Sequence, residues 1–354
     1  MTGEPPARPP TLRDVAERAG VAVSTASRAL TRPGRLRAAT EEHVRAVAAE
    51  LGYEPSPSAR ALSSGRTRMV ALVVPDVTNP YYFGIVRGTA SRLRAAGYVH
   101  VLVDTEESVD AEDRALRALR PTVDGAVLAA SRLDDARLQR WARDLRLVTL
   151  NRPLPGGAGR GVLVDTAGGS VRALEHLAAL GHRRVAYAAG PPTSWSDQRR
   201  RAALRTAARR LGVELVVLGP FAPVREAGAE AADAVLAARV TAARVTAARV
   251  TAGRVTAARV TAVLAFDDLL AFGMLDRFAA RDVDVPGDVS VVGCDDVFGA
   301  DLVRPGLTTV AAPIERVGAL AADLLLARIE GRDPPPLRQV PTRLVIRGST
   351  SPPT

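Results

Sequence analysis

The chain has 354 residues, 47% of them hydrophobic, which is enough for a sizeable core and two or three domains. Its formal net charge is +10, and every basic residue apart from four His is Arg, so composition alone is weak evidence for a nucleic-acid partner. The sequence has no run of 18 apolar residues, and its Pro-rich residues 1–10 contain no apolar leader, so neither a membrane span nor a secretory signal is expected. Cys294 is the single cysteine, so no intramolecular disulfide can form, and we expect a cytoplasmic protein.

Residues 11–54 carry the pattern of a small helical domain. Thr11, with Asp14 three residues later, is typical of a helix start, and Gly20 ends that helix. Residues 23–30 form a second predicted helix, and residues 39–53 form a third amphipathic one. Two short helices joined by a Gly-containing turn predict a helix-turn-helix.

The second of these helices is crowded with groups that suit DNA. Ser24, Thr25, Ser27 and Arg28 offer hydroxyls for phosphates and a guanidinium that can bind guanine through two hydrogen bonds. A plain helical hairpin in some other kind of domain has the same spacing, so the pattern by itself leaves both interpretations open.

The stretches "TLRDVAERAGVAVSTASRAL" and "LGYEPSPSARAL" closely resemble the headpiece and hinge of the lac repressor family. The resemblance implies a headpiece at 11–54, a hinge helix at 55–67, and base reading by Val23, Ser24 and Arg28. It also implies that Leu62 wedges into the minor groove at the operator centre, where such wedges bend DNA. The full set of expected DNA-binding residues is Thr11, Val23, Ser24, Thr25, Ser27, Arg28, Tyr53, Ala59 and Leu62.

Three residues depart from the family pattern. Ala22 stands where a capping Ser is usual, Ala26 replaces a larger Val, and Ser56 replaces the usual Asn before the hinge helix. The missing cap costs roughly 1 kcal/mol, and the smaller Ala26 thins the core, so each change weakens a headpiece without removing its function.

From residue 68 to 350, short apolar runs alternate with helical patterns, as in "MVALVVPDV", "YYFGIVRGTASRLRAAGY" and "VHVLVDT". Repeated strand–helix alternation predicts a parallel, doubly wound α/β sheet, and the restart near residue 169 predicts two Rossmann-like lobes. A ligand crevice is expected at the carboxyl ends of the strands.

The family resemblance continues through "NPYYFGIVRG", "LAALGHRRVAYAAG", "AFDDLLAFGML" and "RPGLTTV", with Asp267 in a position usually held by Asn. It implies a periplasmic-binding-protein-like body, with lobe 1 at about 68–167 and 294–324 and lobe 2 at about 168–293 and 325–350. The implied effector contacts are Tyr81, Tyr82, Arg152, Arg199, Asp268 and Asp295. Aromatic faces that stack on sugar rings, and Arg and Asp that bond hydroxyls, suit a small polar ligand.

Other signals predict no chemistry. The Gly-rich residues 156–161 lack dinucleotide-loop spacing and lead into a strand, and His176 and His182 have no metal-ligand spacing. The pair Asp267–Asp268 is interpreted as polyol-binding, although paired carboxylates also occur in catalysis. We therefore expect no catalytic residue, cofactor or metal.

Residues 239–263 are five copies of a pentapeptide, "RVTAA RVTAA RVTAG RVTAA RVTAV", of which residues 239–258 are an insertion relative to the family. Each copy turns about 140° from the last on a helix, and an odd period alternates faces on a strand, so neither element gains an apolar face. The insertion is expected to be an exposed helical extension or a mobile loop.

Together these features predict a homodimeric repressor of a pseudo-palindromic operator, controlled by a small-molecule effector, a sugar or related metabolite, bound between the lobes. A solute-binding protein of a transport system has the same two lobes but not the headpiece. A sugar- or nucleotide-processing enzyme is the third alternative, and no nucleophile–base set supports it.

Overall fold

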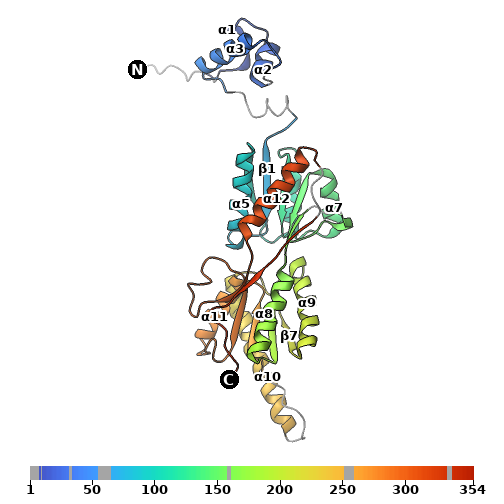
Figure 1. The fold of residues 1–354 in the computed structure, drawn as a ribbon, viewed down its shortest axis with the longest axis vertical. Helices are drawn as coiled ribbons and strands as arrows, with labels where there is room; N and C mark the ends of the chain where they lie inside the picture. The colour runs from blue at the N-terminus through green and yellow to red at the C-terminus, as the bar shows by residue number, and fades with distance from the viewer. Residues whose placement is uncertain are drawn as a thin grey trace, which may run out of the picture. The chain divides into compact units, whose positions relative to one another are not determined.

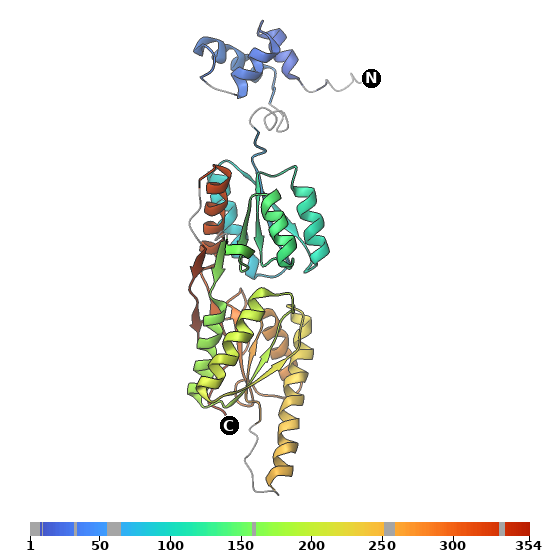
Figure 2. The ribbon, with the colours of Figure 1, turned by 90° about the vertical axis from the view of Figure 1, so that its right-hand side faces the viewer.

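The structure, a computed structural model, describes residue 8 and residues 10–31, 34–54, 65–157, 161–250, 259–332 and 337–354, without the side chains of 240–250. The chain divides into two compact units, residues 1–68 with 122–124, and residues 69–121 with 125–354. Figures 1 and 2 show the helices and strands of both units. The predicted hinge contacts Ala59 and Leu62 lie outside the described residues.

The headpiece consists of α1 (Leu12–Arg18), α2 (Val23–Thr31) and α3 (Ala38–Glu50). Thr11 caps α1 in a full capping box with Asp14, as the spacing predicted. The buried side chain of Glu41 accepts hydrogen bonds from the backbone N–H groups of Gly34 and Leu36, which fixes the turn before α3. The core contains only Ala and Val among its buried residues: Val15, Ala16, Ala19, Ala26, Ala29, Val44, Val47 and Ala48.

One carboxylate holds the chain just after the hinge region. Asp124 Oδ1 accepts hydrogen bonds from the backbone N–H and hydroxyl of Thr67 at 2.7 and 3.0 Å, and its Oδ2 accepts one from the Arg68 N–H at 3.1 Å. Asp124 immediately precedes a strand of lobe 1, so the chain that leaves the hinge is tied to the start of that strand.

Lobe 1 is a six-stranded parallel sheet of order β11-β5-β4-β3-β1-β2. Its elements are β1 (Met69–Val74), α5 (Tyr81–Ala95), β2 (Val99–Asp104), α6 (Val109–Leu119), β3 (Gly125–Ala129), α7 (Asp135–Asp144), β4 (Leu147–Leu150), the 3-10 turn Pro155–Gly157, β5 (Gly161–Val164), α12 (Ile314–Ile329) and β11 (Arg338–Val340). Helices α5 and α12 lie side by side (Figure 1), so close that a Cβ on Gly88 would stand 2.0 Å from the Glu315 carbonyl oxygen.

Lobe 2 repeats this order as β12-β10-β9-β8-β6-β7, with only β12 antiparallel. Its elements are α8 (Thr166–Leu180), β6 (Arg184–Ala188), α9 (Trp195–Leu211), β7 (Glu214–Leu218), the 3-10 turn Arg225–Ala227, α10 (Gly228–Val250), β8 (Ala262–Ala265), α11 (Asp268–Ala279), β9 (Ser290–Asp295), β10 (Thr308–Ala311) and β12 (Arg343–Val345). The predicted fold of two doubly wound α/β lobes is confirmed.

The predicted division of the C-terminal part between the lobes is wrong at two places. Residues 294–311 were assigned to lobe 1, but β10 pairs with β9 in the lobe 2 sheet. Residues 325–340 were assigned to lobe 2, but α12 packs on α5 and β11 pairs with β5 in lobe 1. The chain passes from one lobe to the other three times: after β5, before α12, and between β11 and β12. The second of these crossings comes one strand later in the sequence than predicted, after β10.

Helix α10 continues through the first two copies of the pentapeptide repeat and into the third, and Figure 2 shows it extending from lobe 2. This matches the helical alternative. The first copy is not simply exposed, because the half-buried Arg239 donates to the Asp288 carbonyl oxygen and pairs with its carboxylate. In the last copy, Arg259 donates to the Thr354 carbonyl oxygen at 3.1 Å and Val260 is fully buried. Within the described ranges, no helix is long and apolar enough to cross a membrane.

Candidate functional site

Helix α2 has one buried and one open face. Ala26 and Ala29 pack into the headpiece core, whereas Ser24 and Arg28 are exposed and Val23 is 44% exposed at the start of the helix. The Arg28 Nε donates to the Ser24 carbonyl oxygen at 3.1 Å, which lays the guanidinium stem along the helix. An exposed apolar side chain beside hydroxyls and an Arg, at the N-terminal end of the second helix, is the arrangement with which a recognition helix contacts base edges.

The other predicted DNA contacts are less free. The Thr11 hydroxyl donates to Asp14 Oδ2 at 2.8 Å, and these hydrogen bonds hold the pKa of Asp14 below its usual value. Thr25 and Ser27 are half-buried, and Tyr53 packs against the headpiece core. Their positions fit support of the three headpiece helices better than base reading.

The body has two adjoining cavities where the carboxyl ends of both sheets meet. The inner pocket, of about 50 Å³, is lined from lobe 1 and lobe 2 alike. The outer pocket, of about 640 Å³, shares Glu107 and Pro223 with it. The inner lining residues follow β1 to β5 and β6 to β9, so the position is the switch point at which ligands bind in doubly wound sheets.

Unusual backbone conformations concentrate at the inner pocket. Four of its non-glycine lining residues, Glu107, Ala130, Asn151 and Asp295, have positive φ angles of 56°, 48°, 55° and 122°. Non-glycine residues at positive φ are uncommon because of steric strain, and such strain clusters at binding sites. The strand ends are therefore shaped for the pocket at some cost to local stability.

On the lobe 1 side, Arg132 is held by Glu107 through hydrogen bonds of 2.6 and 2.9 Å. Asn151 donates to the Tyr81 hydroxyl at 2.6 Å and accepts from the Val164 N–H, so it links two sides of the pocket wall. Burial raises the pKa of both Tyr81 and Tyr82, which keeps their hydroxyls neutral. This half of the pocket is largely prearranged.

On the lobe 2 side, polar atoms face the pocket without partners. Asp267 is 3% exposed, and its Oδ1 caps α11 by accepting from the Leu270 N–H at 2.8 Å. Its Oδ2 and the Nε of the buried Arg200 have no hydrogen-bond partner in the part of the chain that the structure describes. Burial raises the pKa of Asp267 to about 6, and burial together with Asp268 raises the pKa of Asp295. Buried polar groups are normally paired, so these atoms indicate a ligand.

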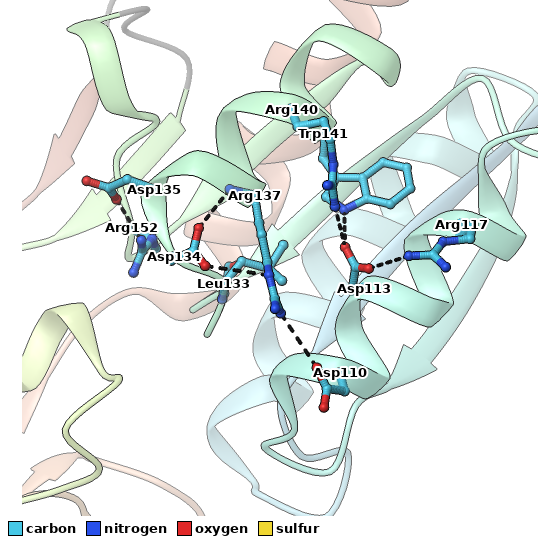
Figure 3. Close-up of polar contacts among 11 residues, drawn as sticks. Asp110, Asp113, Arg117, Leu133, Asp134, Asp135, Arg137, Arg140, Trp141 and Arg152 are labelled. Carbon is cyan, nitrogen blue, oxygen red and sulfur yellow. Dashed lines mark hydrogen bonds and ion pairs between the residues drawn. The ribbon is translucent and has the colours of Figure 1, made fainter.

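Three of the six predicted effector contacts line this pocket: Tyr81, Tyr82 and Asp295. Arg152 does not, because it donates to Asp135 at the start of α7 at 2.8 Å (Figure 3). The same view shows α6 and α7 joined by Asp113, which accepts from Trp141 at 2.7 Å and from Arg117 and Arg140. Arg152 is thus a buried residue of lobe 1 that pairs with the start of α7 and does not line the inner pocket.

The other two predicted contacts, Arg199 and Asp268, do not line the pocket, but a neighbour of each in the sequence does. Arg199 is exposed and lies over the Trp195 ring, whereas the next residue, Arg200, points inward. Asp268 is fully buried, accepts from the Thr309 hydroxyl at 2.6 Å and from the Val297 N–H at 2.9 Å, and does not line the pocket. Burial raises the pKa of Asp268 to about 7. Its neighbour Asp267 faces the ligand space instead.

Sequence reasoning also missed Glu107, Arg132, Asn151, Arg200 and Asp267, which line the inner pocket. A usable signal existed, because Glu107, Arg132 and Asn151 each follow a predicted lobe 1 strand within a few residues. For Arg200, four residues in a row from Gln198 to Arg201 are polar, and only the three-dimensional packing of α9 decides which one turns inward.

Comparisons with known proteins agree with both parts of this arrangement. Residues 11–56 match the family model "Bacterial regulatory proteins, lacI family", and residues 174–350 match the model "Periplasmic binding protein-like domain". The regulator CelR of Thermobifida fusca is 33% identical over 97% of this chain and 98% of its own length. GalR of Escherichia coli K12 is 31% identical over 97% of this chain and 96% of its own length.

Solved structures give the same result. The lac repressor dimer bound to operator and the anti-inducer ONPF is similar with a TM-score of 0.79 and 26% identity, over 97% of this chain and 100% of that one. A CelR–cellobiose complex is similar with a TM-score of 0.68 and 32% identity, over 96% and 99% of the two chains. With a helix-turn-helix headpiece, a two-lobed body and full-length relatives above 30% identity, the chain belongs to the lacI family of bacterial transcriptional regulators, which are DNA-binding proteins and not enzymes.

Proposed function

We propose that this regulator is a homodimeric repressor of a pseudo-palindromic operator, and that a sugar bound in the cleft, in contact with the inner pocket, controls its affinity for DNA. The observation that carries the proposal is the pair of buried, unpartnered atoms, Asp267 Oδ2 and Arg200 Nε, that face one pocket. One is an acceptor and the other a donor, and a sugar hydroxyl can serve either because it both donates and accepts.

Two relatives support this ligand class and this assembly. One similar structure is a complex of CelR with cellobiose, and another is a lac repressor dimer on its operator. The pocket of this chain offers carboxylates, guanidiniums, Asn151 and Tyr81 within a small volume, which suits a compact ligand with several hydroxyls. A regulator that acts on DNA is expected in the cytoplasm.

Exposed apolar side chains support the dimer. On lobe 1, Phe83 is 53% and Val99 59% exposed, beside an apolar groove of about 390 Å³ on α5 and β2. On lobe 2, Phe298 is 82% exposed. Exposed large apolar side chains beside an apolar groove are typical of a protein interface, and a two-fold dimer would present two recognition helices to the two half-sites.

The hinge contacts remain part of the proposal. Ala59 and Leu62 are proposed to enter the minor groove between the half-sites, with the sugar changing operator affinity through the relative orientation of the lobes. Coupling free energies of this kind are typically about 1–3 kcal/mol.

The test is an operator titration with and without a panel of sugars, read by fluorescence anisotropy. Asp267→Asn keeps the helix cap, removes the negative charge and replaces the free acceptor oxygen with an NH₂ donor. The sugar concentration that gives half of the full response is therefore expected to rise by on the order of tenfold. Arg199→Ala, in which the side chain faces away from the pocket, is the matched control and is expected to respond like the parent. Equal responses of both variants would place the effector elsewhere.

A further inference from the structure

The chain as a whole is basic, whereas the lining of its cleft contains more acidic than basic side chains. The chain carries a formal +10, yet the two cavities are lined by six carboxylates and only two guanidiniums. The carboxylates belong to Asp76, Asp104, Glu106, Glu107, Asp267 and Asp295, and the guanidiniums to Arg132 and Arg200. A concave site lined by one sign of charge raises the local concentration of ligands of the opposite sign.

The imbalance is greatest in the outer pocket. Asp76, Asp104, Glu106 and Glu107 line it from the loops after β1 and β2, and its described lining contains no basic residue. Glu107 is paired with Arg132, and both Asp104 oxygens accept backbone N–H groups. The exposed Glu106 side chain forms no ion pair with any described residue, so this wall keeps uncompensated negative charge at the cavity.

The opposite wall of the outer pocket is apolar. It consists of Pro191, Pro192, Pro220, Phe221, Pro223 and Val224 of lobe 2. Proline and aromatic faces pack against the flat C–H face of a pyranose ring, while the groups on the ring edge point to the polar wall. With about 640 Å³, this cavity has room for a disaccharide, whereas the inner pocket of about 50 Å³ admits only the polar groups at one end of a ligand.

A separate observation ties the outer pocket to a ligand. The buried Asp267 Oδ2 and Arg200 Nε are unpartnered among the described residues and face the inner pocket, which adjoins the outer one through Glu107 and Pro223. A ligand that satisfies these two atoms lies at the mouth of the acidic cavity, so any second group on it enters between the carboxylates and the proline wall.

We propose that the effector is an amine-bearing disaccharide or glycoside whose cationic, amino-substituted sugar lies in the outer pocket, with hydroxyl groups at one end reaching Asp267 and Arg200 in the inner pocket. This inference rests on the proposed function, because it assumes that a sugar binds in contact with the inner pocket. It adds the class of the ligand: larger than a monosaccharide, and positively charged rather than neutral or phosphorylated. A phosphorylated sugar is disfavoured because the outer carboxylates would repel it.

The test compares three β-1,4-linked disaccharides by calorimetry on the full chain: the glucosamine dimer, its N,N′-diacetylated form and cellobiose. They share one β-1,4-linked skeleton and differ at carbon 2 of each ring, which carries a cationic ammonium group, a neutral acetamide or a hydroxyl. An exposed ion pair changes binding by about two- to fivefold, so three facing carboxylates give the glucosamine dimer an advantage on the order of tenfold. Raising the salt concentration is expected to shrink that advantage and to leave cellobiose binding unchanged.

Two variants locate the charge effect. Glu106→Gln and Asp76→Asn each remove one outer carboxylate, and each is expected to reduce the preference for the glucosamine dimer by about two- to fivefold. Asp144→Asn is the control, because Asp144 is exposed at the end of α7, near the amino ends of the strands and away from the cleft. It is expected to keep the full preference.

Equal or tighter binding of cellobiose, a preference that survives in both outer variants, or no binding of any of the three disaccharides would overturn the inference. The first two results leave the proposed function standing if Asp267→Asn still weakens the response to the bound sugar by on the order of tenfold. If Asp267→Asn instead responds like the parent, the sugar does not contact the inner pocket and both proposals fail.

Discussion

The outward face of α2 and the inner pocket of the cleft hold similar side chains, Arg beside hydroxyl or carboxyl groups, in different surroundings. On α2, Ser24 and Arg28 are exposed and one turn apart on a single helix. In the pocket, Asp267 and Arg200 are almost fully buried and come from different elements. Substitutions on α2 should therefore change recognition with little change in stability, whereas those around the pocket should change both.

The largest effect is expected from Asp268→Ala. This change leaves the Thr309 hydroxyl and the Val297 N–H buried without their acceptor, at a cost of about 3–5 kcal/mol. For a domain of this size the melting temperature falls by roughly 10 °C. Differential scanning calorimetry checks this, with Arg199→Ala as the control that melts like the parent. If Asp268→Ala melts normally and only loses ligand response, Asp268 is a ligand contact after all.

The pH dependence of stability is a second test of the buried Asp268. The folded protein keeps a proton on Asp268 up to a pKa of about 7, whereas the unfolded chain releases it near 3.8. Because the folded state binds the extra proton between these values, this group's contribution to stability is complete below pH 4 and declines as the pH rises to 7. Asp268→Asn cannot ionise, so its melting temperature relative to the parent is expected to improve steadily from pH 4 to pH 7. A constant difference would mean that Asp268 titrates normally.

On the DNA side, Arg28→Ala is expected to cost about 1–3 kcal/mol of operator binding and to relax base preference at one position, with unchanged melting. Binding to a set of single-base operator variants measures this. Arg18→Ala, an exposed Arg on α1, serves as the comparison and should leave base preference unaltered. A loss that is uniform over all operator variants would assign Arg28 to the phosphates.

A smaller effect is expected at the first headpiece helix. Thr11→Ala removes the hydroxyl of the capping box, which contributes about 1 kcal/mol. Faster amide exchange confined to α1 in the full chain would show it, and Thr11→Ser should restore protection. If DNA affinity falls while exchange stays unchanged, Thr11 acts on DNA directly, as the resemblance implied.

The smallest effect is expected from deleting residues 239–258. All five copies begin with the same four residues, "RVTA". The deletion therefore leaves one "RVTAV" unit, whose Arg takes the place of Arg239 beside Asp288. Surface insertions contribute little to stability, so melting and operator binding should stay close to the parent. A melting temperature lower by more than about 5 °C, equivalent to more than 1 kcal/mol, would mean that the extension packs on the lobe.

The headpiece was more predictable from the sequence than the cleft, because its features depend on residues that are close together in the chain. The cap at Thr11, the buried Ala26 and Ala29, and the exposed Arg28 all depend on spacing within a few residues, and the structure agrees with each. The two lobes were predictable as well, because strand–helix alternation is a local pattern.

The cleft was predictable only in part. Tyr81 and Tyr82 stand at the start of the helix that follows β1, and both line the inner pocket. In the pairs Arg199–Arg200 and Asp267–Asp268, neighbouring residues have the same chemistry, and the rotation of α9 and the capping of α11 decide which one faces the ligand. The crossing before α12 was misplaced because β10 continues the lobe 2 sheet, a pairing between segments that no short-range pattern encodes.

The anchor at Asp124 has a mechanical consequence. Strand β1 begins directly after the anchored Arg68, strand β3 begins directly after Asp124, and the two strands are hydrogen-bonded neighbours. Their far ends lead to Tyr81 and to Arg132 in the cleft. Five residues of strand span roughly 17 Å, and a paired sheet is far stiffer than a loop. The two strands therefore form a short, stiff connection between residues that line the cleft and the anchored backbone of Thr67 and Arg68.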